Sequence, residues 1–218
     1  MKWISTSLIA FLIALLSCNG GANEFQADVK PKLKDQWPPN SLAAGFEIEQ
    51  KNGHRELILT DPEKAEYAKY YLVDRHKPIP NKLDSNFVIR TPVRSVVCGS
   101  TTHASFFSII GRQDVISGIT YSDKVKDSDI LDAINRGEIK DVTGTGELDV
   151  ERVIDLDPEV VILYPSMTMY MQELLAAGIR VLLFAEHNET HPVGRAEWML
   201  VVGEILDVQD DVMDVFNK

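Results

Sequence analysis

Small polar and aromatic side chains follow several short apolar runs in the second half of the chain, where they could bind a ligand. The segments that follow these runs contain hydroxyl, aromatic and imidazole side chains and several glycines, but few lysines or arginines. In open α/β sheets, ligands bind beyond the carboxyl ends of the strands. The pattern therefore predicts a binding site built from these segments. The candidate ligand-binding residues are Ser100, Thr101, Thr102, Tyr121, Gly144, Thr145, Tyr164, Glu186 and His187.

Several of these residues also have a purely structural interpretation. Ser100 can cap a helix that starts directly after a strand, although the free N–H groups and the dipole of that helix would also attract an anion. Gly144 can let the backbone approach a bulky ligand or can simply make a turn. Tyr121 and Tyr164 are either half-buried core residues or aromatic contacts for a large planar or chelate-like ligand. Both interpretations stay open at each position.

The sequence lacks the usual patterns for catalysis and for a resident metal. It contains no Gly-x-Ser-x-Gly motif, and His103, close to Ser100 on one helical turn, does not make a triad with it. His103, His187 and His191 lack a short zinc spacing. The glycine-rich segment 143–146 lacks the lysine of a phosphate-binding loop. We therefore expect neither an enzyme nor a cofactor, and keep an extracytoplasmic hydrolase using Ser100 as an alternative.

The elements that would position these residues alternate between short apolar runs and helix-like stretches from residue 94 onward. This alternation is typical of βα units and a parallel sheet, so the expected fold class is α/β. Residues 45–90 instead alternate like strands around the Asn52-Gly53 turn signal, which predicts a small N-terminal β-meander. The expected strands of the parallel sheet are 95–98, 115–120, 139–142, 160–163 and 181–184, and the expected helices are 102–110, 129–136, 149–156, 169–177 and 194–206.

The first residues have the pattern of an export signal. Lys2 precedes a short apolar run, Leu8–Leu16, which is too short to span a bilayer and is typical of a secretory signal peptide. The sequence Leu-Leu-Ser-Cys resembles a bacterial lipobox, which predicts that residues 1–17 are removed and that Cys18 carries lipid; an ordinary export signal is the alternative. Residues 18–44 are mostly polar, as a tether would be. Either signal, the lipobox or an ordinary export signal, places the protein outside the cytoplasm.

The composition bears on possible partners. With a net charge of -11, binding to nucleic acid or to an anionic membrane surface is not expected, so the lipid would be the only membrane contact. If Cys18 is lipidated, Cys98 has no disulfide partner and is interpreted as a small buried hydrophobic residue.

Several segments together resemble one family, the periplasmic substrate-binding proteins of iron–siderophore and cobalamin ABC importers. The helix-then-strand segment that ends in Pro-Glu-Val-Val-Ile and the run Pro-x-Gly-Arg-Ala-Glu-Trp are the more specific parts. The resemblance covers roughly residues 45–218. The segments that carry it are 91–97, 100–102, 121–123, 148–162 and 189–198.

The resemblance implies two α/β lobes joined by a long rigid helix, with the ligand held between the lobes. Residues 45–208, with the meander at 45–90, would form the N-terminal lobe. Residues 209–218 would start the interlobe helix, and the C-terminal lobe would be missing. Because half of the cleft would then be absent, these 218 residues are expected to bind the ligand weakly.

The resemblance also implies a function. The chain would be a lipid-anchored periplasmic protein that captures a ferric siderophore or a related chelate, such as cobalamin or haem, and delivers it to an ABC permease and its ATPase. The family docks through one acidic residue on each lobe, and Glu173 is a weak substitute for the acid of the N-terminal lobe. Binding of bare zinc or manganese, as in other members of the same superfold, stays open as an alternative.

Overall fold

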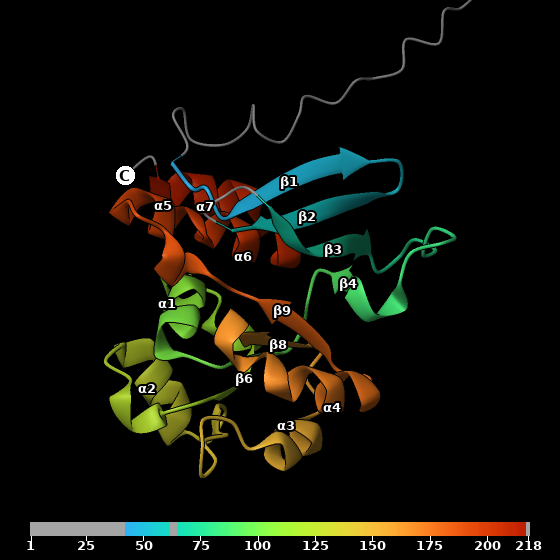
Figure 1. The fold of residues 1–218 in the computed structure, drawn as a ribbon. Helices are drawn as coiled ribbons and strands as arrows, with labels where there is room; N and C mark the ends of the chain where they lie inside the picture. The colour runs from blue at the N-terminus through green and yellow to red at the C-terminus, as the bar shows by residue number, and fades with distance from the viewer. Residues whose placement is uncertain (1–41, 62–64, 217–218) are drawn as a thin grey trace, which may run out of the picture. The chain divides into compact units, whose positions relative to one another are not determined.

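The computed structural model describes residues 42–61 and 65–216 (Figure 1). The predicted signal peptide at 1–17, the lipidation site Cys18 and nearly all of the predicted tether lie outside the described residues. The described chain contains a four-stranded sheet, in the order β1-β2-β3-β4, and a five-stranded sheet, in the order β7-β6-β5-β8-β9. Among the described residues, no helix combines the length and the apolar character needed to cross a membrane.

The first sheet begins as the predicted meander. Strands β1 (Phe46–Lys51) and β2 (His54–Thr60) pair antiparallel around Gly53, which has a positive φ of 88°. Strand β3 (Glu66–Asp74) pairs antiparallel with β2. Strand β4 (Val88–Thr91) departs from a meander, because it runs parallel to β3. The segment between them, which includes the short 3₁₀ helix η2 (Ser85–Phe87), carries the chain back so that β4 starts beside Tyr71 in the middle of β3.

The second sheet confirms the predicted α/β class, because all of its strands are parallel and helices flank it (Figure 1). Helix α1 packs against α2 and α6, and α3 packs against α4. The strands are β5 (Val96–Cys98), β6 (Ile116–Ile119), β7 (Lys140–Asp141), β8 (Val160–Leu163) and β9 (Arg180–Leu183), and the helices are α1 (Thr101–Ile109), α2 (Ser128–Asn135), α3 (Val150–Leu156), α4 (Met171–Ala176), α5 (Pro192–Glu197), α6 (Met199–Leu206) and α7 (Gln209–Phe216).

Helix α6 packs between β4 of the first sheet and α1, which flanks the second sheet. All of its residues, including Glu204, are buried, and a helix that is buried on every side needs neighbours on every side. It packs against α1, β4 and α7, and the Val93 N–H donates to the Ile205 carbonyl at 2.8 Å. At Gly203 an added Cβ would lie 2.8 Å from Val212 Cγ2 of α7. Glycine there allows the close approach of α6 and α7.

Two predicted helices differ from the structure. The helix expected at 194–206 is divided into α5 and α6 at Trp198, and it starts earlier, at Pro192. His191 supplies the reason for the early start, because its Nδ1 accepts a hydrogen bond from Val193 N at 3.1 Å and caps α5. The helix expected at 169–177 is shorter, since the 3₁₀ helix η5 (Pro165–Tyr170) precedes α4.

Tyr70 of β3 links the first sheet to β9, and it gives a testable pH effect. The side chain is fully buried, its hydroxyl accepts a hydrogen bond from Leu183 N at 3.0 Å, and burial raises the pKa of the phenol well above its ordinary value. A phenol with a raised folded-state pKa contributes stability that is complete below its unfolded-state pKa and is lost as pH rises toward the folded-state value.

We therefore expect the free energy of unfolding to fall at alkaline pH more steeply in the native chain than in Tyr70→Phe. Between pH 10 and 11.5 the extra loss should be about 2 kcal/mol, because each pH unit above the ordinary phenol pKa costs about 1.4 kcal/mol. Urea unfolding of both proteins at pH 8.5, 10 and 11.5 measures it. Identical pH slopes for the two proteins would contradict this role of Tyr70.

Candidate ligand-binding site

The carboxyl ends of β5, β8 and β9 bring three of the predicted residues into one hydrogen-bonded group. Tyr164 lies between the other two: its hydroxyl is 2.9 Å from Ser100 Oγ and donates to Glu186 Oε1 at 3.2 Å. The phenol has a single proton, so Ser100 donates to it. These residues are far apart in sequence and meet because β5, β8 and β9 are neighbours in the sheet.

The group lies where the direction of the chain through the sheet changes. From β5 the chain goes to β6 and β7 on one side, and then crosses to β8 and β9 on the other side. Such a switch point between strands is where open α/β sheets bind ligands. The pair formed by Ser100 and Tyr164 lies at the carboxyl ends of β5 and β8, which border this point.

Ser100 has the predicted capping role as well. It is extended, with φ of -159° and ψ of 149°, and its side chain accepts a hydrogen bond from Thr102 N at 3.1 Å. At the preceding Gly99, an added Cβ would lie 2.8 Å from the Ile162 carbonyl of β8. Thr101 is half-buried and Thr102 is exposed in the first turn of α1. The cap and the contact with Tyr164 are therefore both made by the same hydroxyl.

A column of aromatic rings runs from the core to the surface at this site. The ring of Tyr164 lies 4.4 Å from that of His103 and 4.7 Å from that of His187. His103 also contacts Phe184, at 5.4 Å, and Phe184 contacts Trp198, at 4.8 Å. His187 is exposed, Tyr164 is half-buried, and the other rings are buried. Trp198 is thus part of the core.

His103, for which the sequence indicated neither a triad nor a zinc site, lies in the core of the fold. It is fully buried, because its side of α1 packs into the core with Ala104 and Phe107. Neither of its ring nitrogens has a hydrogen-bond partner among the described residues. Its Nε2 lies 3.6 Å from Oε2 of Glu186. This oxygen is also buried and has no hydrogen-bond partner among the described residues. The sequence offered no signal for this buried pair.

The environment keeps Tyr164 protonated. Burial raises the pKa of its phenol, and the nearby carboxylate of Glu186 acts in the same direction, against the hydrogen bond from Ser100. A phenol with a raised pKa is a neutral hydrogen-bond donor and an aromatic surface at physiological pH. Tyr164 can therefore contact a ligand through its ring while its hydroxyl is held by Ser100 and Glu186.

The remaining predicted residues form a second group at the ends of β6 and β7. Tyr121 adopts a left-handed conformation, with φ of 55°, and its N–H donates to Thr143 Oγ1 at 2.7 Å. The ammonium of Lys124 lies 3.9 Å from the centre of its ring. A Cβ at Gly144 would lie 3.0 Å from the Leu148 carbonyl, which explains the glycine as a close turn. Thr145 is exposed.

Asp141 organises this second group and was not among the predicted residues. Its carboxylate accepts hydrogen bonds from Thr143 N at 2.7 Å, from Ser122 N at 3.1 Å and from the Ser122 hydroxyl. Burial acts to raise the pKa of Asp141, but these hydrogen bonds outweigh it and lower the pKa. Among the described residues, no hydrogen bond or ring contact joins this group to the one around Tyr164.

Metal-binding and nucleophilic chemistry gain no support from the described residues. They contain no group of three or more His, Cys, Asp or Glu residues that could hold a metal ion. Ser100 is hydrogen-bonded to Tyr164 rather than to a histidine, and His103 is hydrogen-bonded to neither Ser100 nor Tyr164. Glu173, the predicted docking acid, is exposed in the first turn of α4, whereas Glu186 is buried.

The fold is that of open α/β proteins, which as a class bind ligands at the carboxyl edge of a parallel sheet. The family described as periplasmic binding protein matches residues 96–218. Since this is more than half of the 218 residues, the chain belongs to that family, a class of substrate-binding proteins.

Among curated proteins, the chain is 26% identical over 166 residues to an uncharacterized lipoprotein of Methanocaldococcus jannaschii, covering 69% of this chain and 39% of that protein. Among solved structures, it is similar to the siderophore-binding protein BauB bound to ferric acinetobactin, with 19% identity, a TM-score of 0.48, and coverage of 58% of this chain and 44% of that chain. It is also similar to the iron-uptake substrate-binding protein PiuA of Streptococcus pneumoniae, with 14% identity, a TM-score of 0.44, and coverage of 72% of this chain and 46% of that chain. The chain spans less than half the length of each.

Proposed function

We propose that this protein is the extracytoplasmic solute-binding component of an ABC importer and that it captures a ferric siderophore or a related metal chelate, such as cobalamin or haem. The observation that carries the proposal is the pair formed by Ser100 and Tyr164 at the switch point of the parallel sheet. The exposed ring of His187 extends the aromatic surface that Tyr164 offers. Membership of the periplasmic binding protein family supports the same function.

The chemistry of this surface suits a large chelate better than a bare cation. A chelate already satisfies the coordination of its metal, so the protein needs to supply ring surfaces and hydrogen bonds rather than ligand atoms. The exposed edge offers the rings of Tyr164 and His187 and the hydroxyls of Thr101 and Thr102. A bare zinc or manganese ion would instead require several convergent imidazoles and carboxylates.

Tryptophan fluorescence tests the proposal. Trp198 contacts Phe184, which in turn contacts His103 beneath Tyr164, so a strongly absorbing chelate bound at this edge would quench its emission. We expect saturable quenching by a ferric hydroxamate, a ferric catecholate, haem or cobalamin, and none by zinc or manganese. Saturation by the bare ions, with no response to any chelate, would overturn the proposal in favour of a metal-binding protein.

Ligand binding by the 218 residues alone should be weak. A two-lobed protein buries most of its ligand between lobes, and pockets for small molecules bury about 70–90% of the ligand surface. The described residues supply one such surface, at the ends of β5, β8 and β9. We expect dissociation constants in the micromolar range or weaker, and a nanomolar constant would contradict the two-lobed arrangement.

Replacing Tyr164 with phenylalanine should weaken chelate binding about fivefold. The change keeps the ring that would contact the ligand but removes the hydroxyl that Ser100 and Glu186 hold at 2.9 and 3.2 Å. The ring then loses the hydrogen bonds that orient it toward the ligand, and a loss of about 1 kcal/mol of binding free energy corresponds to about fivefold in affinity. Tyr67→Phe is the matched control, because Tyr67 is exposed on β3. Equal affinities of native protein and Tyr164→Phe would argue against this site.

Membrane anchoring and permease docking complete the proposal. Cys18 would carry lipid after removal of residues 1–17, and an exposed Glu173 would contact the permease. Incorporation of radioactive fatty acid should be lost in Cys18→Ser, so retained label would contradict anchoring at Cys18.

Uptake of the chelate by cells should be reduced by Glu173→Ala without loss of binding, and unchanged uptake would remove Glu173 from the docking surface.

A further inference from the structure

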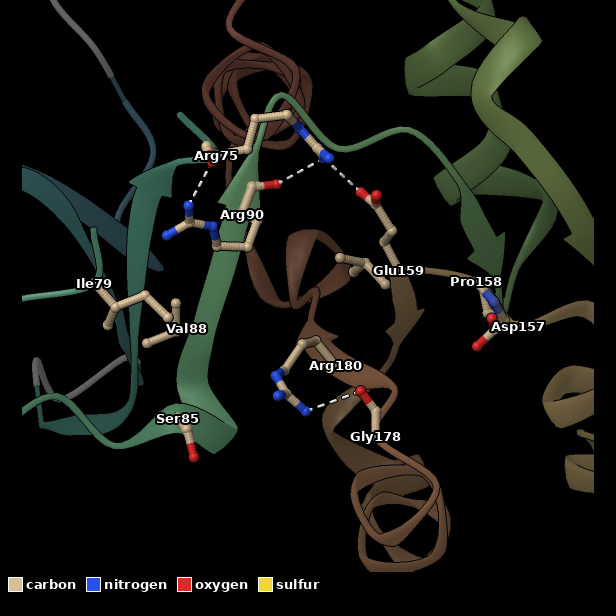
Figure 2. Close-up of a pocket in the computed structure, with 11 residues that line it drawn as sticks. Arg75, Ile79, Ser85, Val88, Arg90, Asp157, Pro158, Glu159, Gly178 and Arg180 are labelled. Carbon is tan, nitrogen blue, oxygen red and sulfur yellow. Dashed lines mark hydrogen bonds and ion pairs between the residues drawn. The ribbon is translucent and has the colours of Figure 1, made fainter. Parts of the chain in front are cut away.

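Charged side chains are placed unevenly between the two ends of the parallel strands. At the amino-terminal ends of β8 and β9, beside β4, three arginines line a cavity of about 470 Å³ (Figure 2). The arginines are Arg75, Arg90 and Arg180. The segments that follow β5, β8 and β9 at the carboxyl edge, residues 99–103, 164–168 and 184–189, contain two glutamates but no lysine or arginine. This difference bears on which ligand charge the carboxyl edge accepts.

Glu186 places a buried negative charge next to Tyr164. Only 3% of its surface is exposed, and its Oε1 accepts a hydrogen bond from the Tyr164 hydroxyl at 3.2 Å. Its Oε2 has no hydrogen-bond partner among the described residues, and within them no lysine or arginine forms an ion pair with it. The carboxylate therefore lies close to the proposed ligand surface without a permanent cation to balance it.

His103 does not balance this charge either, although its Nε2 lies 3.6 Å from Oε2 of Glu186. An imidazole is a cation only when both nitrogens carry protons, and both N–H groups then need acceptors. Neither nitrogen of His103 is hydrogen-bonded within the described part of the chain, and its buried ring contacts those of Tyr164 and Phe184. A buried imidazolium without hydrogen bonds is costly, so the arrangement fits a neutral imidazole beside a carboxylate.

Arg195 of α5 is a cation near the same edge, but it does not reverse the balance. Its guanidinium donates to the backbone carbonyls of His187 and Glu189 at 3.1 and 3.2 Å. Because Arg195 is exposed, water and salt screen its charge. Glu189 is 5% exposed and adds a second buried carboxylate to the segment. The less screened charges of this segment are therefore negative.

Two other positive groups belong to the strand exits. The amino-terminal end of α1 carries the equivalent of about half a charge, which is less than the full charge of Glu186, and the Ser100 hydroxyl caps it. The ammonium of Lys124 lies over the ring of Tyr121, in the separate group at the ends of β6 and β7, together with the carboxylate of Asp141. Neither group offsets Glu186 beside Tyr164.

A buried charge acts on a ligand more strongly than an exposed one at the same distance, because the protein interior screens it less than water does. A ligand at the ring of Tyr164 would lie within the range of this charge even though Glu186 itself is buried. Allowing for screening at an open surface, the expected effect is about threefold to tenfold in affinity for each unit of ligand charge.

We propose that Glu186 makes the carboxyl edge selective for metal chelates of zero or positive net charge, such as ferric hydroxamates, over anionic chelates such as ferric catecholates and haem. Glu186 acts through its charge rather than through contact with the ligand, because it is buried. The inference rests on the proposed function, since it specifies which chelates the same surface accepts.

The test compares three forms of one ferric chelate on the 218-residue chain. Ferrioxamine B is cationic through its free amine, its N-acetyl derivative is neutral, and its N-succinyl derivative is anionic, while the iron centre is the same in all three. Fluorescence titration at pH 7.5 and low ionic strength measures the three dissociation constants. We expect the affinity to fall in that order, by about threefold to tenfold at each step.

Two variants assign the selectivity to Glu186. Glu186→Gln removes the charge and keeps a carbonyl oxygen that can accept from Tyr164, so the three affinities should become equal. Glu138→Gln removes the same charge from an exposed side chain that precedes β7, at the other end of the strands, and should leave the order intact. An unchanged order in Glu186→Gln would overturn the role of Glu186.

The comparison on the native chain is decisive even if Glu186→Gln does not fold. Equal affinities for the three forms, or the highest affinity for the anionic form, would overturn the selectivity and leave the proposed function standing. Binding of a ferric catecholate or haem, with none of the ferrioxamines bound, would do the same. Binding of no chelate of any charge would remove both the selectivity and the proposed function.

Discussion

Replacing Arg55 with methionine is expected to lower the free energy of unfolding at neutral pH by about 3–5 kcal/mol, because it leaves a buried carboxylate without its counterion. Glu204 is 2% exposed, and its Oε2 lies 2.6 Å from Nη1 of Arg55. The same guanidinium donates to Thr91 Oγ1, to the Glu204 carbonyl and to Asp207. It thereby ties β2 to the end of α6. Chemical denaturation at pH 7.5 measures the loss.

The loss should depend on pH and should be rescued by a second change. Burial raises the pKa of Glu204, with Arg55 acting against it. Without Arg55 the pKa rises further, so the carboxyl is neutral in acid and the penalty of the variant is smaller at pH 4.5 than at pH 7.5. The double variant Arg55→Met with Glu204→Gln should recover most of the stability.

Arg136→Met is the matched control for this prediction. Arg136 pairs with Glu138 at 2.8 Å, but both side chains are more than half exposed, and such surface pairs contribute little to stability. The control should therefore unfold like the native protein. A loss for Arg55→Met no larger than that of the control would show that Glu204 tolerates its burial without the guanidinium.

Replacing Glu189 with alanine is expected to cost about 3 kcal/mol, because it leaves several buried donors without an acceptor. The carboxylate accepts from Trp198 Nε1 at 3.0 Å, from Ala44 N at 3.0 Å and from Gly45 N at 2.8 Å. It is 5% exposed. Glu197 similarly accepts from the N–H groups of residues 42 and 43. The beginning of the described chain is therefore fastened to α5 and the segment before it.

Urea unfolding, followed by tryptophan emission, measures this loss. Glu189→Gln keeps one carbonyl acceptor and should fall between the native protein and the alanine variant. Glu147→Ala, in an exposed loop, is the control and should leave the unfolding midpoint unchanged. If Glu189→Ala unfolds at the same urea concentration as this control, the hydrogen bonds to residues 44 and 45 do not hold the first sheet in place.

The alternation of strands and helices could be predicted from local pattern. The expected strand 160–163 matches β8, and the expected strands and helices from residue 95 to 156 have counterparts within a few residues. Short apolar runs with helical stretches between them contain this information locally. The parallel pairing of β4 could not be predicted, because it depends on where the joining segment 75–87 returns the chain. The break at Trp198 depends on packing around a buried indole.

The candidate site was predictable as a list of strand exits but not as a set of contacts. Ser100 and Tyr164 meet because β8 pairs with β5, although β6 and β7 lie between them in the sequence. The burial of His103 was hidden, because a histidine on a helix gives no local sign of which face packs inward. The arginines of the cavity come from three separate segments and show no spacing that would associate them.

The sequence by itself determined the α/β class and the resemblance to a binding-protein family that the comparison over residues 96–218 confirms, and it led to the prediction that a ligand binds at the strand exits. Those features depend on residue types and spacings along the chain. The tertiary structure alone decided which exits meet, which carboxylates are buried against which cations, and where the arginine-lined cavity forms. Those features depend on strand order and on packing between distant segments, and a linear pattern does not encode distances across a sheet.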